Sequence, residues 1–276
     1  SLGHAAFIGV GAYSSAILVS KLGFPFLLAL PAAGAITSIV GMLFGLPSLR
    51  IKGLYLAMAT LAAQVVLHFL MLNWESLTGG VYGYVVPPAT IGPLTLDTDQ
   101  KYYYLVMVVV VLATLSTKQL FRTKIGRACV AIRDRDIAAE VIGVSLFKYK
   151  LQSFGISSFY AGVAGSLLAH YMSVITPDHF PLSLSIEYLA IIIIGGLGSV
   201  LGSILGAFFI ILLPEFLNEV MSSLGGVFPN AANILPYMRM ISFGLIIVIF
   251  IIFEPKGLAE IYARVKKYFK LWPYAY

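Results

Sequence analysis

The sequence has few charged residues and a single cysteine. Only 11% of its 276 residues are charged, whereas soluble globular proteins carry about 25%. Because 59% of the residues are also hydrophobic, this composition excludes a soluble domain. The one cysteine, Cys129, excludes an internal disulfide and a metal site made of several thiolates. The composition therefore predicts a membrane protein in which redox chemistry is not expected.

Motifs that would bind nucleotides or metals are also missing. No Gly-x-x-x-x-Gly-Lys-Ser/Thr stretch occurs, so any use of ATP must lie on another subunit. The four histidines include no His-Glu-x-x-His and no pair at the spacing of metal ligands, and hydrogen bonds between helices explain them better than catalysis. We therefore expect no catalytic residue, metal or cofactor in this chain. The start lacks the features of a signal peptide, and we expect the natural N-terminus to lie upstream of Ser1.

Long stretches without charge predict the membrane spans, because a bilayer crossing needs about 20 mostly apolar residues. We predict an all-α polytopic membrane protein with about seven to eight transmembrane helices, organised as a single permease domain over residues 1–276. The predicted spans are 5–20, 24–46, 53–72, 102–120, 151–173, 182–214 and 237–253. Residues 76–96 are equally uncharged but rich in glycine and proline, and this composition predicts a long loop.

The basic residues predict the orientation of these spans. Fifteen of the eighteen lysines and arginines fall in three segments, 50–52, 118–150 and 256–270. Because positively charged connections are retained in the cytoplasm, we place these segments there, together with the C-terminus. The tail over residues 255–276 has the pattern of an interfacial helix, which we interpret as an anchor against anionic lipid.

The segment 182–214 has to begin and end outside if this orientation holds. About 32 residues give a helix of roughly 48 Å, whereas two crossings of a bilayer core need about 60 Å. We therefore predict an interrupted or re-entrant helix pair, with a turn at Gly195–Ser199 and an ascending helix that ends near Leu213. The alternative is one long tilted helix, which would move Glu215 to the inside.

Small residues predict close packing of helices at two places. Glycines at four-residue spacing let a neighbouring backbone approach, which is how many membrane helices associate. The residues assigned to the helix break and to close packing are Gly195, Gly196, Gly198, Gly202 and Gly206. A second small-residue face pairs Ala161 with Gly165 and Ser158 with Gly162 in the span 151–173.

The cytoplasmic loop 121–150 is too long for a simple connection. Its charged lead-in precedes a short predicted helix over 137–142, which Asp136 would N-cap and Gly143 would end. Such a helix suits docking into a groove of a soluble partner; the alternative is a solvated loop helix that only satisfies the positive-inside rule. The predicted coupling residues are Arg133, Asp134, Arg135, Asp136, Ala138, Ala139, Glu140 and Gly143.

Candidates for the translocation path are fewer. We name His4, Thr78, Gly79 and Glu187. Glu187 is predicted to begin the descending half-helix, where it would contribute to a polar outer vestibule. The helix dipole alone also explains an acidic residue at that position.

Several stretches carry a resemblance to a known family. Residues 137–143 resemble the Glu-Ala-Ala-x-x-x-Gly loop by which bacterial ABC importer permeases contact their ATPases, with Ile137 in place of the glutamate. More specifically, the chain resembles the high-affinity branched-chain amino acid permeases of the LivM type. The matching stretches are SLGHAAF at 1–7, GLYLAMATL at 53–61, GR at 126–127 with AIRD at 131–134, GGLGS at 195–199 and EPKGL at 254–258. Residues 81–84 depart from the family, which usually has a polar Gly-rich continuation there.

The resemblance implies a permease subunit of an ATP-driven importer in the bacterial inner membrane. It implies that branched-chain or related hydrophobic amino acids enter the cytoplasm by alternating access. The implied partners are a homologous LivH-type permease, two cytoplasmic ABC ATPases that hold ATP and Mg, and a periplasmic or extracellular amino acid binding protein. Alternatives are a related importer for urea or another small solute, or a passive channel or membrane scaffold. The resemblance also implies further apolar sequence upstream of Ser1.

Overall fold

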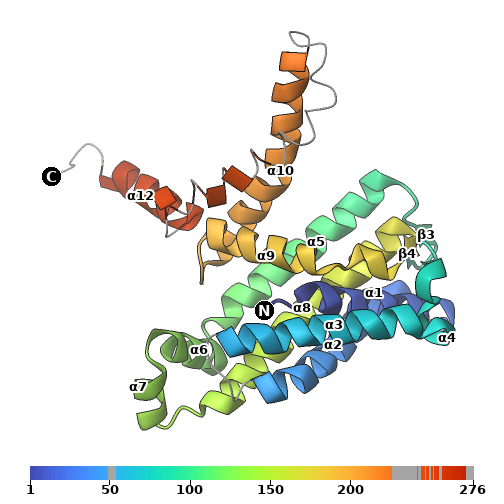
Figure 1. Cartoon of the computed structure of the whole chain (residues 1–276), viewed down its shortest axis with the longest axis horizontal. Coiled ribbons are helices and arrows are strands. Elements are labelled where there is room, and N and C mark those ends of the chain that lie inside the picture. The colour runs from blue at the N-terminus through green and yellow to red at the C-terminus, as the bar shows by residue number, and fades with distance from the viewer. Residues whose placement is uncertain are drawn as a thin grey trace. The chain divides into compact units, whose positions relative to one another are not determined.

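The computed structural model describes residues 1–48, 54–225, 241, 244–245, 247–248, 250, 252–254 and 257–271. They belong to two compact units, Ser1–Ile186 and Glu187–Tyr276 (Figure 1). The all-α class is confirmed, although a few very short strands accompany the helices. The helices are α1 (His4–Ser20), α2 (Phe26–Ser48), α3 (Leu54–Asn73), α4 (Glu75–Thr78), α5 (Asp99–Leu120), α6 (Lys124–Asp134), α7 (Asp136–Val141), α8 (Leu146–Met172), α9 (Leu182–Gly195), α10 (Val200–Gly225) and α12 (Leu258–Leu271).

Five segments in the described part of the chain are long and apolar enough to cross a membrane. They include α2, α3, α5 and α10, and the fifth runs from Pro177 to the end of α9. Helix α1 is apolar but has only 17 residues, whereas α8 has 27 residues and is about 40 Å long. A polytopic membrane protein is therefore supported. The finer count of seven to eight spans stays a prediction, because 237–253 lies largely outside the described residues.

In the core of the first unit, α8 packs closely against α1 and α2. Helix α3 also packs against α1 and α2. A Cβ atom added at Gly11 would overlap the backbone of Gly162, and one added at Gly165 would collide with the carbonyl oxygen of Ile8. Helices α1 and α8 therefore touch backbone to backbone, as small residues allow in membrane proteins. The small-residue face predicted in 151–173 is confirmed as a buried packing face, since Ser158 and its partners on that face are buried.

Side chains from other helices satisfy the first backbone amides of α1. Its N-cap, Gly3, has no side chain to accept them, and these amides have no partner within the helix. Ala5 N donates to Ser185 Oγ at 2.9 Å, and Ala6 N donates to Gln64 Oε1 at 2.8 Å. Gln64 Nε2 in turn donates to the carbonyl oxygen of Phe180 at 2.9 Å. Gln64 thus joins α1, α3 and the segment before α9.

We expect Gln64→Leu to lower the free energy of unfolding by about 2–3 kcal/mol, because it leaves the Ala6 amide and the Phe180 carbonyl buried without that partner. Unfolding in detergent, followed by circular dichroism, measures the change. Gln152→Leu is the matched control, because the buried Oε1 atom of Gln152 has no hydrogen-bond partner. Equal losses in the two variants would contradict the role given to Gln64.

The predicted loop over 76–96 is confirmed, and no long helix interrupts it. It contains α4, the 3₁₀ turn η1 (Gly80–Tyr82) and the strands β1 (Tyr84–Val85), β2 (Thr90–Ile91) and β3 (Leu94–Thr95). Strand β1 pairs with β4 (Val174–Ile175), and β2 pairs with β3. A second 3₁₀ turn, η2 (Pro177–His179), follows β4. Two-residue strands carry no periodic pattern, which is why the sequence did not indicate them.

A buried histidine fixes this loop to the helices. His170 Nδ1 lies 2.8 Å from the carbonyl oxygen of Pro87, and His170 Nε2 lies 3.0 Å from Ser15 Oγ. Ser166 Oγ donates to Ser15 Oγ at 2.7 Å. This chain of hydrogen bonds joins α1, α8 and the loop. His170 therefore agrees with the interpretation of the histidines as hydrogen-bonding groups between helices, whereas the buried Nδ1 atom of His68 has no hydrogen-bond partner.

Candidate functional site

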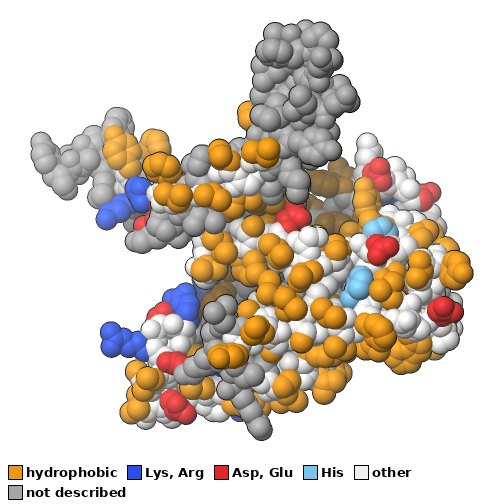
Figure 2. All heavy atoms as spheres, in the orientation of Figure 1, with side chains coloured by type: hydrophobic (Ala, Val, Ile, Leu, Met, Phe, Trp, Pro, Cys, Tyr) orange, Lys and Arg blue, Asp and Glu red, His pale blue; other side chains and the backbone are white. Residues whose placement is uncertain are grey.

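Helices α6 and α7 form the connection between α5 and α8. Thr123 caps α6, because its Oγ1 atom accepts a hydrogen bond from Gly126 N at 3.4 Å. Figure 2 shows lysine and arginine side chains near α6 and α7, and acidic and histidine side chains at the end of the first unit that carries the short strands. Burial raises the pKa of the Cys129 thiol on α6, so this thiol stays protonated at neutral pH.

The short helix α7 begins one residue earlier than predicted. Asp136 is its first residue rather than its N-cap; the cap position belongs to Arg135, and Asp136 Oδ1 accepts a hydrogen bond from Ile137 N at 2.9 Å. The predicted end is confirmed. Gly143 has a φ of 89°, a left-handed conformation that glycine adopts without strain. It ends the helix with hydrogen bonds from Gly143 N to Glu140 O and from Val144 N to Ala139 O, both 2.9 Å long.

Helix α7 presents an exposed apolar face, which we call the α7 face and define as Ile137, Val141 and Ile142. These side chains are 72%, 82% and 76% exposed. Clusters of exposed apolar side chains mark interaction surfaces. The sequence analysis did not assign these three residues, although the four-residue spacing of Ile137 and Val141 indicates a shared helix face.

The predicted coupling residues divide into two groups in the structure. Ala139 is 2% exposed and packs inside the loop, and its assignment to ATPase coupling stays a prediction. The other predicted coupling residues are exposed, except Asp136, which is half-buried. Arg133 Nη2 lies 2.9 Å from Asp134 Oδ1, and both side chains are about 60% exposed, at 59% and 60%. An apolar centre with charged surroundings is the usual composition of a protein interface.

The glycines predicted at the helix break come together in the second unit. A Cβ atom at Gly202 would lie 2.9 Å from the carbonyl oxygen of Gly196, and one at Gly195 would overlap Gly202. A Cβ atom at Gly206 would overlap the carbonyl oxygen of Ile191, so α10 turns back along α9. The break between them contains Gly196 and Gly198 at φ values of 110° and 77°. The described residues therefore form two packed helices, which excludes one long helix.

This pair differs from the prediction in length. Helix α10 has 26 residues and continues beyond Leu213, so at about 39 Å it is long enough to cross a bilayer alone. Helix α9 has 14 residues, which is short for a crossing. Re-entry of the pair into the membrane stays a prediction.

The residues predicted for the translocation path have separate local roles. The His4 ring packs edge-on against Phe7, with centroids 6.0 Å apart. Thr78 is buried, and its hydroxyl donates to Met71 O at 2.7 Å and accepts from Gly80 N at 3.2 Å. Gly79 ends α4 with a φ of 76°. Thr78 and Gly79 thus shape a turn, and their assignment to a solute path stays a prediction.

Glu187 also lies elsewhere than predicted. Helix α9 begins at Leu182, so Glu187 is in its second turn and does not begin the helix. Its side chain is exposed. The helix dipole acts mainly within the first turn, so the dipole does not account for this residue. A role for Glu187 in solute passage stays a prediction.

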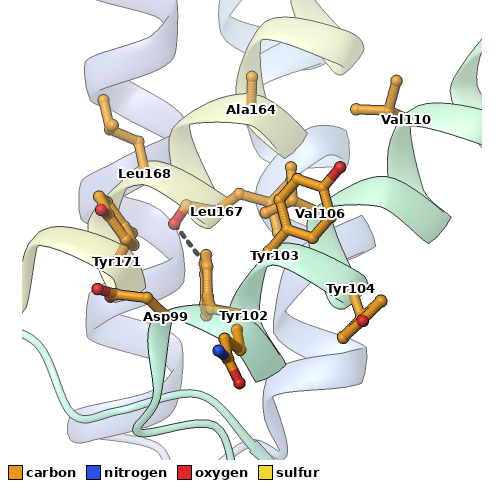
Figure 3. Close-up of a pocket in the computed structure, with 11 residues that line it drawn as sticks. Asp99, Tyr102, Tyr103, Tyr104, Val106, Val110, Ala164, Leu167, Leu168 and Tyr171 are labelled. Atoms are coloured by element: carbon orange, nitrogen blue, oxygen red, sulfur yellow. Dashed lines mark hydrogen bonds between the residues drawn. The ribbon is translucent and has the colours of Figure 1, made fainter.

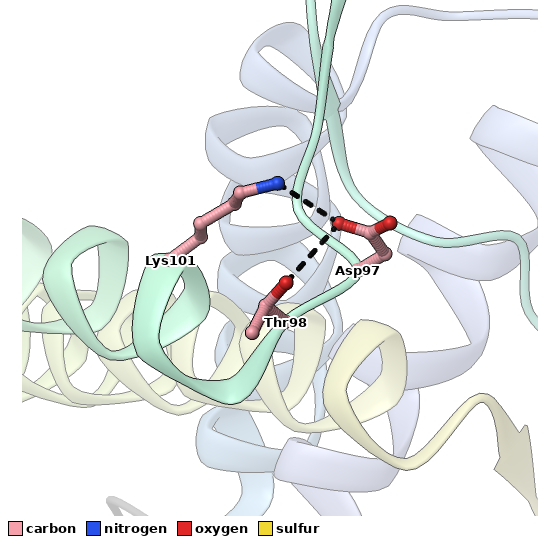
Figure 4. Close-up of polar contacts among 3 residues, drawn as sticks. All are labelled: Asp97, Thr98 and Lys101. Atoms are coloured by element: carbon pink, nitrogen blue, oxygen red, sulfur yellow. Dashed lines mark hydrogen bonds and ion pairs between the residues drawn. The ribbon is translucent and has the colours of Figure 1, made fainter.

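A charged pair marks the start of α5. Lys101 Nζ lies 3.2 Å from Asp97 Oδ1, and Thr98 Oγ1 donates to the same oxygen at 3.5 Å (Figure 4). The hydrogen bond from Lys101 is the main cause that lowers the pKa of the Asp97 carboxyl below its ordinary value. Both side chains are exposed, and exposed pairs contribute little to stability.

We expect Lys101→Met to raise the pKa of Asp97 back toward its ordinary value. Since the folded-state pKa is lowered, the pair's stabilising contribution is complete above the unfolded-state pKa and is lost as the pH falls through the folded-state pKa. A carboxyl carbon NMR titration measures the shift. Thr98→Ala is the control, with a smaller rise expected. An unchanged pKa in Lys101→Met would contradict the assignment.

Comparison with known proteins identifies the family of the chain. A family model described as "Branched-chain amino acid transport system / permease component" matches residues 1–250. The chain belongs to this family. The resemblance seen in the sequence motifs is thereby confirmed. The family is described as the permease component of branched-chain amino acid transport systems.

Individual relatives of the permease agree. It is 33% identical to the high-affinity branched-chain amino acid transport system permease protein LivM of Salmonella typhimurium over 82% of its own length and 60% of that protein. LivM of Escherichia coli is 32% identical with the same coverage. A probable LivH permease of Methanocaldococcus jannaschii is 26% identical over 91% of this chain and 80% of that protein. The chain thus spans 60% of the length of these two LivM proteins. No solved structure matches it.

Proposed function

We propose that this permease is the transmembrane subunit of an ATP-driven importer for branched-chain or related hydrophobic amino acids. The observation that carries the proposal is the α7 face, which exposes three apolar side chains on the loop between α5 and α8. A chain without a P-loop needs a separate source of energy. Two cytoplasmic ABC ATPases, which hold ATP and Mg, would supply it by binding this face.

Alternating access is the proposed mechanism. ATP would close the ATPases, and the movement would reach α7 and then α8, which follows it in the chain. Because α8 packs along α1 and α2 through backbone contacts, a shift of α8 moves these helices with it. A partner changes such an equilibrium only if its affinity differs between the two states. The ATPase contact therefore has to depend on the conformational state.

We propose the remaining partners from the resemblance to this family. Both LivM and LivH permeases resemble this chain, and we propose that a LivH-type permease pairs with it. A periplasmic or extracellular amino acid binding protein would deliver the substrate. We place the complex in the bacterial inner membrane with α12 on the cytoplasmic side, where the exposed apolar residues of this helix would lie at the membrane interface.

The α9–α10 pair is the element that we propose for the centre of the complex. Its break includes two glycines at positive φ. Irregular backbone at membrane depth is tolerated only where protein buries it or where it lines a water-filled cavity. If the pair re-enters the membrane, its break therefore lies beside the solute path.

The decisive experiment is purification with candidate ATPases followed by transport. We expect a P-loop ATPase to co-purify with the permease, and proteoliposomes of the complex with the binding protein to accumulate leucine only with ATP. Leucine flux without ATP would instead favour the alternative of a passive channel or scaffold. Uptake of urea but not leucine would favour an importer for another small solute.

A further inference from the structure

A groove opens in the first unit between α5 and α8, with a volume of about 870 Å³. Its apolar walls come from both helices, and Asp99 lines it at the N-terminal end of α5, which we call its mouth (Figure 3). The residues that matter for its chemistry are Asp99, Tyr102, Tyr104, Val110, Leu167 and Tyr171. A volume of this size accommodates a long apolar ligand.

The floor of the groove is fixed before any ligand binds. Tyr102 and Leu167 are 5% and 8% exposed and belong to a buried cluster with Phe26 and Ala89. The Tyr102 hydroxyl donates to the carbonyl oxygen of Leu167, and the Tyr102 ring lies 5.6 Å from that of Tyr171. The polar atom of the floor is therefore satisfied, and the surface that it presents to the groove is apolar.

The surroundings of the groove favour a membrane ligand. Helix α5 is a candidate membrane span of 22 residues, and no residue in its most apolar stretch is buried inside the structure. An open apolar groove on such a helix faces hydrocarbon chains rather than water. Tyr103 and Tyr104, which are 58% and 69% exposed, lie near the end of this span. Tyrosines in this position typically lie at the level of the lipid headgroups.

The charge at the mouth selects the headgroup. Asp99 is exposed, and no ion pair involves it among the residues that the structure describes. The nearby Lys101 is already paired with Asp97, and no described lysine or arginine lines the groove. A single carboxylate next to tyrosine rings attracts an ammonium group. It repels a phosphate headgroup that carries no positively charged group.

We propose that this groove binds one phospholipid, with an acyl chain along α5 and α8 and the ammonium headgroup at Asp99. Phosphatidylethanolamine has this chemistry. The proposal does not depend on the transported solute or on the ATPases, so it can fail or hold independently of the proposed function.

Native mass spectrometry of the detergent-purified chain tests the proposal, with phosphatidylethanolamine and phosphatidylglycerol of identical acyl chains added in equal amounts. We expect one retained phosphatidylethanolamine per chain. Asp99→Asn should lower the preference over phosphatidylglycerol by about threefold, the size of one exposed charge pair. Val110→Trp should abolish retention because it fills the groove. Val111→Trp is the matched control, since Val111 is similarly exposed on α5 but does not line the groove.

Three outcomes would overturn the proposal. Equal retention in Val110→Trp, Val111→Trp and the unchanged chain would mean unspecific annular lipid. Displacement of the lipid by free leucine would mean that the groove is a solute site. A photo-crosslinker at position 110 that captures a second protein chain, and no lipid, would mean that the groove is a protein interface. Thermal unfolding of each variant verifies that the substitutions leave the fold intact.

Discussion

Val141→Arg is expected to reduce ATP-driven amino acid uptake by about tenfold or more and to weaken co-purification of the ATPase. Val141 is 82% exposed on α7, so the substitution leaves the packing of the permease unchanged. It places a charge at the centre of an apolar face, where partner contact would bury it without a counter-charge. Substitution of a residue at the centre of an interface commonly lowers the binding free energy by about 2 kcal/mol or more. Uptake in proteoliposomes and pull-down of the ATPase measure the two effects.

The matched control is Ser145→Arg, which places the same charge on an exposed residue of the same loop outside the α7 face. It should leave uptake and co-purification near their original levels. Ala139→Arg would be less informative, because Ala139 is buried and its replacement would disturb the loop itself. Full uptake in Val141→Arg, with the protein correctly folded, would remove the main support for a docking role of α7.

Gly206→Leu is expected to separate α9 from α10 and to lower the free energy of unfolding by about 3 kcal/mol. A side chain at position 206 would occupy the space of the Ile191 carbonyl oxygen and would also lie 3.0 Å or less from the backbone of Gly195. Backbone atoms do not move aside as a flexible side chain does, so the whole helix has to shift. Thermal unfolding in detergent, with the yield of monodisperse protein, measures the loss.

Ser203→Leu is the control for this experiment. Ser203 lies one turn before Gly206 on the same helix and is exposed, so an apolar side chain there should be tolerated. Similar melting temperatures for the two leucine variants would show that the α9–α10 contact contributes little. Gly206→Ala, which adds only the Cβ atom, should fall between the control and Gly206→Leu.

The sequence predicted those features that depend on local composition and on charge. The loop over 76–96 was identified because its glycines and prolines exclude a long helix. The break after Gly195 was identified because Gly195, Gly196 and Gly198 interrupt the apolar run there. The end of α7 at Gly143 followed from helix capping, an interaction between residues close together in the chain.

The sequence was less informative about side chains whose roles depend on distant partners. Thr78 was assigned to a solute path, and the structure adds that backbone groups of its own turn occupy its hydroxyl. Gln64 carries no motif, and it became important only because the fold brings α1 and the segment before α9 next to it. No local pattern reports which amide will lie beside a given side chain.

The small number of charged residues and their uneven distribution were enough to identify this chain as a membrane protein with one long charged loop. The reason is that a charged side chain is costly to place in hydrocarbon, whatever the fold. The tertiary structure alone decided which side of α7 faces outward, since Ala139 is buried by packing whereas Val141 is not. It also decided that α5 and α8 leave a groove with a carboxylate at its mouth. Burial and exposure depend on which elements pack together, and that is a property of the whole fold.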